Sequence, residues 1–252
     1  MNPNRAIYET HYSPADLRVR ATTPYDEAMI RLRFSLVEHY GSTRDVLDVC
    51  CGTGAYLLPC VDRVRRAVGL DFSKPMLDAC HSAAGGGAGQ SLLVLGDAAR
   101  LPLADCSFDF VFSFASLYYV PDVGSAIREI ARVLRSGGHA AFELGNRHSL
   151  NTLVTAVQHA TKGWAKPFHV PARAMRAYVR EAGLQLVAWR AFQLLPMYGA
   201  PARLFYLLPL LSAQWKRILG VRLRGRMLDE WISSSWPLRY LAFRHLFIVR
   251  KP

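Results

Sequence analysis

The chain of 252 residues is poor in the patterns that indicate a metal centre or a disulfide framework. It has five cysteines, an odd number, with no Cys-x-x-Cys pair and with Cys50 and Cys51 adjacent. That spacing builds neither a zinc site nor a set of disulfides, so we expect reduced thiols and no metal requirement. The first residues are polar and lack the apolar core of a signal sequence, which predicts a cytoplasmic protein.

Acidic residues are scarce in the second half of the chain. Residues 1–143 carry 14 Lys/Arg and 16 Asp/Glu, whereas residues 144–252 carry 17 Lys/Arg and only 3 Asp/Glu. A positive field of this kind favours an anionic partner, which includes a phosphorylated or carboxylated substrate, an anionic membrane surface and nucleic acid. A solvated basic surface without a partner is the alternative.

Residues 46–54 carry the most functional information. An apolar, β-branched segment leads into a turn that contains Gly52 and Gly54, and glycines there let a backbone approach a ligand closely. A second apolar segment ends at Asp71, 17 residues after Gly54, where a carboxylate can accept hydrogen bonds from ribose hydroxyls. A third ends at Asp97, placed for an adenine amine. The order predicts a pocket for an adenosine-bearing cofactor.

This series resembles the class I S-adenosylmethionine-dependent methyltransferases, in particular the broad group that includes the ubiquinone and menaquinone biosynthesis methyltransferases. The family's first motif, apolar-Asp-x-Gly-x-Gly-x-Gly, is matched at Asp48, Gly52 and Gly54, while Cys50 replaces the first glycine. A thiol fits there if φ is negative. Residues 96–111 and 126–138 resemble two further family segments, so that the resemblance covers roughly residues 44–145. A nicotinamide-binding domain, the alternative, would need glycine at Leu57.

The resemblance implies S-adenosyl-L-methionine as cofactor and no metal. We expect Tyr8, His11 and Tyr12 to close over the cofactor as an N-terminal flap, and surface aromatic residues without such a role are the alternative. The implied cofactor-binding residues are Tyr12, Asp48, Cys50, Gly52, Gly54, Asp71, Phe72, Met76, Asp97, Ala98 and Phe114.

The expected architecture is one α/β domain with a doubly wound, mostly parallel seven-stranded sheet. Strands are predicted near 45–50, 66–71, 91–96, 108–114, 139–145, 184–193 and 240–250, and the family implies that the last is antiparallel. Helices are predicted from Thr23 to about Tyr40, near 55–63, 74–84 and 122–135, and from Pro171 to Gly183. Residues 1–43 form the flap and first helix, 44–145 the cofactor-binding core, and 146–252 the substrate side.

Two insertions, near 147–170 and 194–238, follow strand five and separate strands six and seven. Because both connections leave from the active-site face, we expect them to cap the substrate pocket as helical lids. The second begins with an apolar stretch that is broken by prolines, a glycine and Arg203, which makes it a poor membrane span. The segment predicts a lid over an apolar substrate or contact with the inner face of an anionic membrane. The residues expected to bury the apolar part are Met197, Phe205, Tyr206 and Trp215. Those expected to meet the anionic part are Arg203, Arg217 and Arg222. Plain core helices are the alternative.

Methyl transfer from a sulfonium needs alignment and the exclusion of water, and it needs a base only if the nucleophile is protonated. The best-placed histidine is His148, just past strand five, with Arg147 beside it, and a helix-start or surface imidazole without a catalytic role is the alternative. Tyr118 and Tyr119 follow strand four and are its predicted catalytic neighbours. The other histidines considered, His39, His81, His139, His159 and His245, are predicted to be structural.

The sequence therefore predicts methyl transfer to an O, N or C nucleophile of a small, apolar or aromatic and anionic molecule. An RNA methyltransferase is the second hypothesis, suggested by the basic half. Against it, no RNA-binding appendage is recognisable, and Ser113-Phe114-Ala115-Ser116 replaces the Asn/Asp-Pro-Pro-Tyr/Phe motif. A non-catalytic cofactor-binding protein is the third hypothesis.

Overall fold

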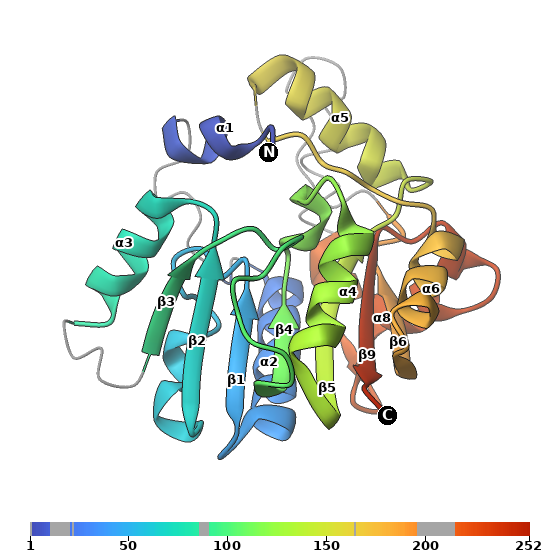
Figure 1. Cartoon of the computed structure of the whole chain (residues 1–252). Helices are drawn as coiled ribbons and strands as arrows, with labels where there is room; N and C mark the ends of the chain where they lie inside the picture. Colours follow the sequence, from blue (N-terminus) through green and yellow to red (C-terminus); the bar gives the residue numbers. More distant parts are fainter. Residues whose placement is uncertain (1, 11–20, 22, 86–90, 164, 196–214) are drawn as a thin grey trace.

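The fold is built on one seven-stranded sheet in the order β3-β2-β1-β4-β5-β9-β6 (Figure 1). The structure is a computed structural model that describes residues 2–10, 21, 23–85, 91–163, 165–195 and 215–252. Within this sheet the described strand pairs are parallel except those of β9, which is antiparallel to β5 and β6. The predicted doubly wound sheet with an antiparallel last strand is confirmed. The strands are β1 Asp45–Val49, β2 Arg66–Asp71, β3 Ser91–Leu95, β4 Phe108–Ser113, β5 Leu134–Gly145, β6 Gln185–Phe192 and β9 Arg244–Arg250.

Helices cover both faces of the sheet. One face packs against α4 and α6 around Phe142, Ile127 and Met175, and the other packs against α2 around Phe110, Phe112 and Val37. As predicted, α2 begins after Thr23, whose hydroxyl accepts a hydrogen bond from the Asp26 N–H (3.2 Å). The described helices are α1 Arg5–Thr10, α2 Pro24–Gly41, α3 Lys74–Ala83, α4 Val123–Val133, α5 Leu150–Lys162, α6 Ala172–Glu181 and α8 Leu228–Ser234.

The predicted helix over 55–63 is wrong as an α-helix. The segment after Gly54 is a turn followed by the 3-10 helix Leu58–Arg63. Pro59 explains the difference, because it has no N–H to donate to the carbonyl of Ala55. The predicted start of β5 at 139 is also late, since the strand begins at Leu134.

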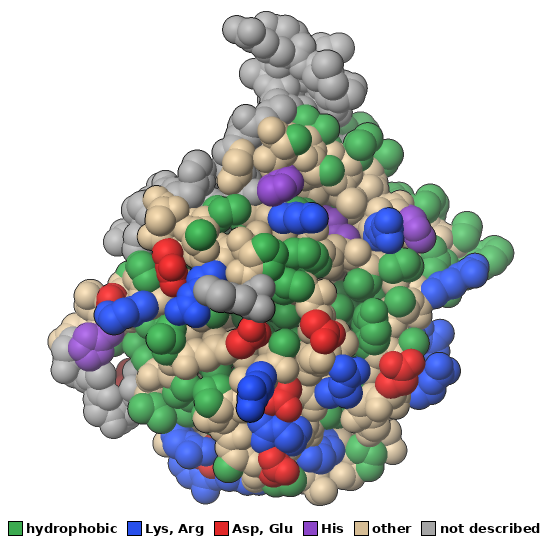
Figure 2. Space-filling view, turned by 45° about the horizontal axis from the view of Figure 1, so that its top comes forward, with side chains coloured by type: hydrophobic (Ala, Val, Ile, Leu, Met, Phe, Trp, Pro, Cys, Tyr) green, Lys and Arg blue, Asp and Glu red, His purple; other side chains and the backbone are tan. Residues whose placement is uncertain are grey.

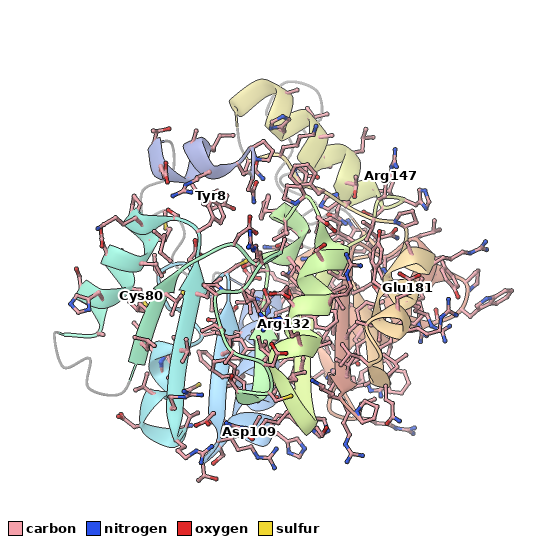
Figure 3. The ribbon with its side chains drawn as sticks, viewed as in Figure 1. Tyr8, Cys80, Asp109, Arg132, Arg147 and Glu181 are labelled. Atoms are coloured by element: carbon pink, nitrogen blue, oxygen red, sulfur yellow. The ribbon has the colours of Figure 1, made fainter. Side chains whose placement is uncertain are left out.

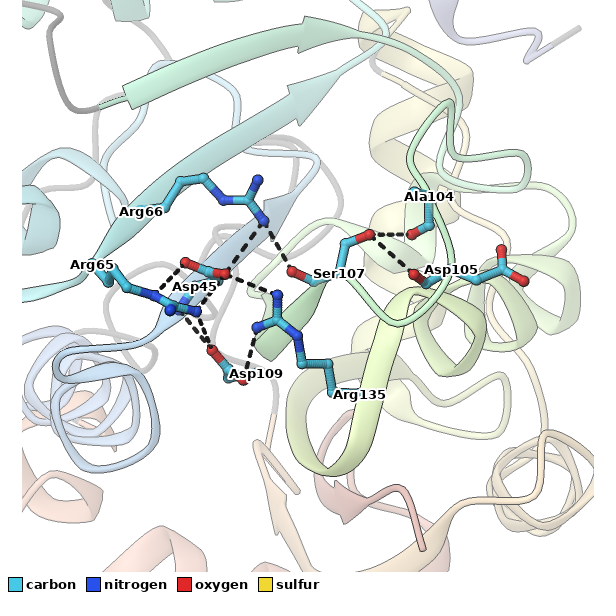
Figure 4. Close-up of polar contacts among 8 residues, drawn as sticks. All are labelled: Asp45, Arg65, Arg66, Ala104, Asp105, Ser107, Asp109 and Arg135. Carbon is cyan, nitrogen blue, oxygen red and sulfur yellow. Dashed lines mark hydrogen bonds and ion pairs between the residues drawn. The ribbon is translucent and has the colours of Figure 1, made fainter.

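Arginines tie the amino ends of four neighbouring strands together (Figure 4). Asp45 in β1 accepts hydrogen bonds from Arg65 (2.9 and 2.6 Å) and from Arg135 (3.0 Å). Arg135 also pairs with Asp109 in β4 (2.9 Å). In Figure 3 the labelled Asp109 lies at the edge of the sheet opposite α1 and α5, so this network leaves the carboxyl edge clear.

Two helices lie above the carboxyl ends of the strands, α1 and α5 (Figure 1). The second predicted insertion is described only at its ends, where 215–219 is helical and a hairpin pairs Arg222–Leu223 (β7) with Arg226–Met227 (β8). Predicted substrate residues Met197, Arg203, Phe205 and Tyr206 lie outside the described residues. Within the part of the chain that the structure describes, no helix is long and apolar enough to cross a bilayer.

Candidate functional site

A cavity of about 280 Å³ opens at the carboxyl ends of β1, β2 and β4. This is the point where the strand order reverses, at which open α/β sheets bind their ligands. Tyr118 and Tyr119, the predicted catalytic tyrosines, line it. So do seven of the predicted cofactor residues, namely Asp48, Cys50, Gly52, Asp71, Phe72, Met76 and Phe114.

Asp71 connects the end of β2 to the glycine turn. Its Oδ2 accepts a hydrogen bond from the Gly52 N–H (2.9 Å), and its Oδ1 accepts one from the Ser73 N–H (2.9 Å). Each carboxylate oxygen has two lone pairs, so both retain acceptor capacity toward the cavity. Burial raises the pKa of Asp71 in spite of these hydrogen bonds. The side chain therefore fixes the turn and can also bind a pair of hydroxyls.

Asp48 lies deeper, in β1, with 4% of its surface exposed. Burial, reinforced by the negative charge of Asp71, raises its pKa well above the usual range. Among the described residues it makes no ion pair. A cationic ligand in the cavity would favour its ionised form and be bound by it.

Two residues at the strand ends, Cys50 in the glycine turn and Ala115 after β4, are non-glycine residues in the left-handed backbone region. Cys50 has φ = 62° and Ala115 has φ = 59°, and both line the cavity. The condition of a negative φ, under which a thiol fits without strain, is not met at Cys50, so this thiol occupies a conformation in which glycine would be relaxed. Gly52 takes φ = 53°, and a Cβ there would meet no protein atom within 4 Å. Strained residues of this kind cluster at ligand sites, and the open space at Gly52 fits a ligand close to the backbone.

Three predicted cofactor residues do not line the cavity, and a fourth lies outside the described residues. Gly54 serves packing, since a Cβ there would lie 2.5 Å from the Cys80 Sγ. Asp97 is exposed and accepts a hydrogen bond from the Ala99 N–H (2.9 Å), while Ala98 is buried in the core. Tyr12 belongs to the segment that is not described, as does His11. Their predicted roles stay predictions.

The N-terminal segment reaches the cavity through Tyr8. In Figure 3 this residue extends from α1 toward the strand ends, and its ring contacts Phe72 (centroids 5.5 Å apart) and Tyr119 (6.1 Å). The Asn4 side chain donates to the carbonyls of Tyr119 (3.3 Å) and Lys166 (2.9 Å), and accepts from the Lys166 N–H (2.8 Å). These contacts place α1 over the cavity, where the flap was predicted.

A buried ion cluster that sequence reasoning missed lies behind the cavity wall. Glu143 in β5 is fully buried and binds Arg33 through two hydrogen bonds (2.8 and 2.9 Å) and Arg244 through a third. Burial alone would raise the pKa of Glu143, but the two arginines lower it to about 2. Arg33 also donates to the Tyr56 hydroxyl (2.5 Å), and Arg244 lies 5.7 Å from the Tyr118 ring centroid. The cluster carries a net charge of +1 beside two cavity-lining rings.

The histidine beside Tyr118 is His169, not His148. His148 is exposed and does not line the cavity, and its neighbour Arg147 is exposed as well. The sequence does not predict His169 as a site residue, because residues 165–170 have no strand or helix signal that would place it. Its ring lies 6.0 Å from that of Tyr118 and 5.0 Å from that of Phe243. Burial lowers the pKa of His169 to about 4, so the imidazole is neutral at pH 7.

Predicted substrate residues from the second insertion have structural partners or lie at the surface. Trp215 is 37% exposed, and its neighbour Lys216, which was not a predicted substrate residue, pairs with Asp26 (3.0 Å). Arg217 and Arg222 are not among the residues that line the cavity. Figure 2 shows hydrophobic side chains interspersed with Lys and Arg on the visible face. The described residues contain no cluster of three His, Cys, Asp or Glu that could hold a metal.

Comparisons with known proteins agree with this geometry. Residues 47–142 match a family model described as a methyltransferase domain. A demethylmenaquinone methyltransferase of Bacillus velezensis is 41% identical over 96 residues, 36% of this chain and 41% of the relative. Its counterpart in Staphylococcus epidermidis is 39% identical over 110 residues, 40% of this chain and 45% of the relative. The chain thus spans less than half the length of these two relatives.

Solved structures extend the likeness to nearly the whole fold. The magnesium protoporphyrin IX methyltransferase of Synechocystis, solved with bound S-adenosylhomocysteine, has a TM-score of 0.62 at 10% identity and covers 98% of this chain and 97% of its own. An S-adenosylmethionine-dependent methyltransferase of Mesorhizobium loti has a TM-score of 0.60 at 19% identity, with coverages of 89% and 98%. The [4+2]-cyclase SpnF has a TM-score of 0.58 at 20% identity, with coverages of 93% and 84%. The fold thus serves more than one reaction. Residues 47–142 are thus similar to a methyltransferase domain, and the sheet has the topology of Rossmann-like S-adenosylmethionine-dependent methyltransferases.

Proposed function

We propose that the protein transfers a methyl group from S-adenosylmethionine to an O, N or C nucleophile of a small, apolar and aromatic molecule. The observation that carries the proposal is the cavity at the switch point of the sheet, which is lined by Asp48, Asp71 and Gly52. In this proposal Asp71 accepts hydrogen bonds from the ribose hydroxyls. Asp48 attracts the positively charged methionine portion of the cofactor.

The proposal of an aromatic acceptor rests on the walls of the same cavity. Tyr8, Phe72, Tyr118 and Tyr119 contribute rings, and no lysine or arginine is among the lining residues that the structure describes. Rings bury an apolar acceptor and exclude water from the reacting atoms, which this chemistry needs. The similarity to demethylmenaquinone methyltransferases supports an acceptor of the quinone type.

We also propose that such an acceptor is collected at an anionic membrane surface. Leu150 and Leu153 on α5 are 59% and 65% exposed, and Arg147, three residues before the helix, is exposed as well. Apolar side chains with a basic neighbour are typical of interfacial helices. Flotation with anionic vesicles should show binding that high salt abolishes, and Leu150→Ser with Leu153→Ser should remove it. Equal binding to neutral vesicles, or none, contradicts this part of the proposal.

Calorimetry with S-adenosylmethionine tests the assignment of the cofactor. Asp71→Ala should weaken binding by about 1–3 kcal/mol, because it removes a charged acceptor from two hydroxyls and releases the Gly52 turn. Asp78→Ala is the matched control, since among the described residues the side chain of this exposed residue of α3 pairs with Lys74 alone. Wild-type affinity in Asp71→Ala, or tighter binding of a nicotinamide dinucleotide, would contradict the proposal.

A further inference from the structure

A groove of about 440 Å³ lies between α6 and the strands β6 and β9, away from the cavity. Figure 1 shows these elements together at one end of the sheet, where β5 and β9 separate β6 from β4. The groove and the cavity have no lining residue in common. A ligand in the groove would therefore occupy a second site, distinct from the one proposed for the cofactor.

Three arginines of α6 line the groove without a carboxylate partner. Arg173, Arg176 and Arg180 are exposed, and their spacing of three and four residues puts them on one side of the helix. In the described part of the chain none of them forms an ion pair, and neither does the adjacent Glu181. Like charges that are gathered on one surface repel one another, and an anionic ligand would relieve that repulsion.

Aromatic rings hold these guanidinium groups in place. The Arg173 Cζ lies 5.9 Å from the Tyr240 ring centroid. The Arg176 Cζ lies 5.6 Å from the Trp189 ring, whose centroid is 6.1 Å from that of Tyr240. Arg239, which donates to a backbone carbonyl (2.8 Å), adds a positive charge 4.7 Å from the same indole. A guanidinium group stacked on a ring is fixed in orientation, which suits bidentate binding of phosphate oxygens.

The groove also has an apolar floor and a considerable length. Leu186 of the edge strand is 41% exposed there, beside the partly buried Tyr240 and the buried Phe247. Along α6, Arg173 and Arg180 are separated by about 10 Å, since each residue of a helix adds about 1.5 Å. A chain of phosphates spans such a distance better than a single phosphate does. An apolar ring on the floor would complete a ligand of a size that fits this groove.

We propose that the groove binds a nucleoside polyphosphate, with its phosphates at the arginines of α6 and its nucleoside over Leu186. The phosphate chain neutralises positive charges that the described residues leave unpaired. This ligand also accounts for part of the basic excess of residues 144–252, where 17 Lys/Arg face 3 Asp/Glu. Binding does not depend on the proposed methyl transfer, because the two sites share no lining residue.

Calorimetry of the full chain with uridine triphosphate tests the site. A pyrimidine is the better probe, because an adenine nucleotide could also enter the cavity. We expect binding at low salt that weakens as salt is raised, since the main contacts are between charges. Saturation with S-adenosylhomocysteine should leave this affinity unchanged. No binding at low salt, or competition between the two ligands, would overturn the proposal.

Inorganic tripolyphosphate separates the nucleoside from the phosphates. It should bind about tenfold more weakly than uridine triphosphate, because it has no ring to cover Leu186. Leu186→Ser should remove this difference and leave the affinity for tripolyphosphate unchanged. Equal affinities of the two ligands for the wild type would overturn the assignment of a nucleoside.

Two exposed helical arginines provide a matched pair of variants. Arg176→Gln removes a phosphate contact and should weaken binding of uridine triphosphate by about tenfold. Arg31→Gln removes the same charge from α2, on the opposite face of the sheet, where Arg31 pairs with Glu27. This control should bind like the wild type. Equal losses in the two variants would show a general attraction to positive charge and would overturn the groove as the site.

Discussion

Asp48 and Asp71 on the β1–β2 side of the sheet and Glu143 on the β5 side are buried alike, yet their surroundings are opposite. Asp48 and Asp71 are 4% and 6% exposed and have no cationic partner in the described part of the chain, and burial raises both pKa values. Glu143 is fully buried between Arg33 and Arg244, which lower its pKa to about 2.

The difference separates a binding role from a structural one. A buried carboxylate without a cation reduces stability, and a cationic ligand can pair with it and favour its ionised form. A carboxylate between two guanidinium groups is saturated and fixes the strands that carry them. By this comparison the β1–β2 side is the ligand-binding side, because its buried carboxylates are left for a ligand to neutralise.

The largest effect should come from Glu143→Gln. The change leaves Arg33 and Arg244 buried side by side without a carboxylate, which typically costs about 3–5 kcal/mol. Urea unfolding measures it. The control is Glu38→Gln, whose partner Arg63 is exposed, and there the loss should be ~0–1 kcal/mol. Equal losses in the two variants would show that the buried cluster is not what stabilises the β5 side.

Acid should weaken the same side through His245. Trp189 donates to its Nδ1 (2.8 Å), and burial lowers the pKa of His245 to about 4. Because the unfolded histidine titrates near 6.5, stability present above that pH is lost as the pH falls toward 4, by about 3 kcal/mol at most. His245→Gln lacks this titration, so the difference in the free energy of unfolding between the variant and the wild type should become smaller as the pH falls. A difference that does not change with pH would contradict the assignment.

The two sides also differ in how well their contacts can be predicted from the sequence. The strand, glycine turn and following acid at 46–71 are close in sequence, so their spacing alone predicts that Asp48, Gly52 and Asp71 meet. Glu143 meets Arg33 and Arg244 across separations of 110 and 101 residues, and no spacing rule relates them. The strand order and the antiparallel β9 were predictable from alternating elements and the family resemblance.

Other details depended on contacts that no local pattern encodes. His169 acquires its place from an irregular segment that hydrogen-bonds to the end of β5 through Val170 and Gly145 (3.0 Å). Gly54 matches the ligand-turn pattern but serves the packing of Cys80. The positive φ of Cys50 is fixed by the turn, and the residue type alone indicated the opposite.

Asp48→Asn tests the other half of the comparison. Removing an unpartnered buried charge should stabilise the ligand-free protein by ~1 kcal/mol and weaken binding of S-adenosylmethionine. The sign follows from the raised pKa, since the folded state disfavours the charge that the unfolded state carries above about pH 4. The gain should therefore be present at neutral pH and vanish in acid. Thermal unfolding and calorimetry measure the two effects, and a destabilised variant would show that Asp48 has a structural partner.

The smallest expected effect comes from relieving backbone strain at two cysteines, one in the cofactor site and one outside it. Cys50 and Cys106 both have positive φ, 62° and 49°, but Cys50 lines the cavity and Cys106 is exposed. Replacement by glycine removes the steric cost of a left-handed backbone, about 1–2 kcal/mol. It also gives the unfolded chain more conformational entropy, which destabilises the folded state by about 0.4–1 kcal/mol. Each Cys→Gly change should therefore stabilise the protein by under ~1 kcal/mol. Only Cys50→Gly should also alter the affinity for S-adenosylmethionine, because the thiol faces the space that the cofactor is proposed to fill. If both variants gain stability and neither changes affinity, the strain at Cys50 belongs to the turn alone.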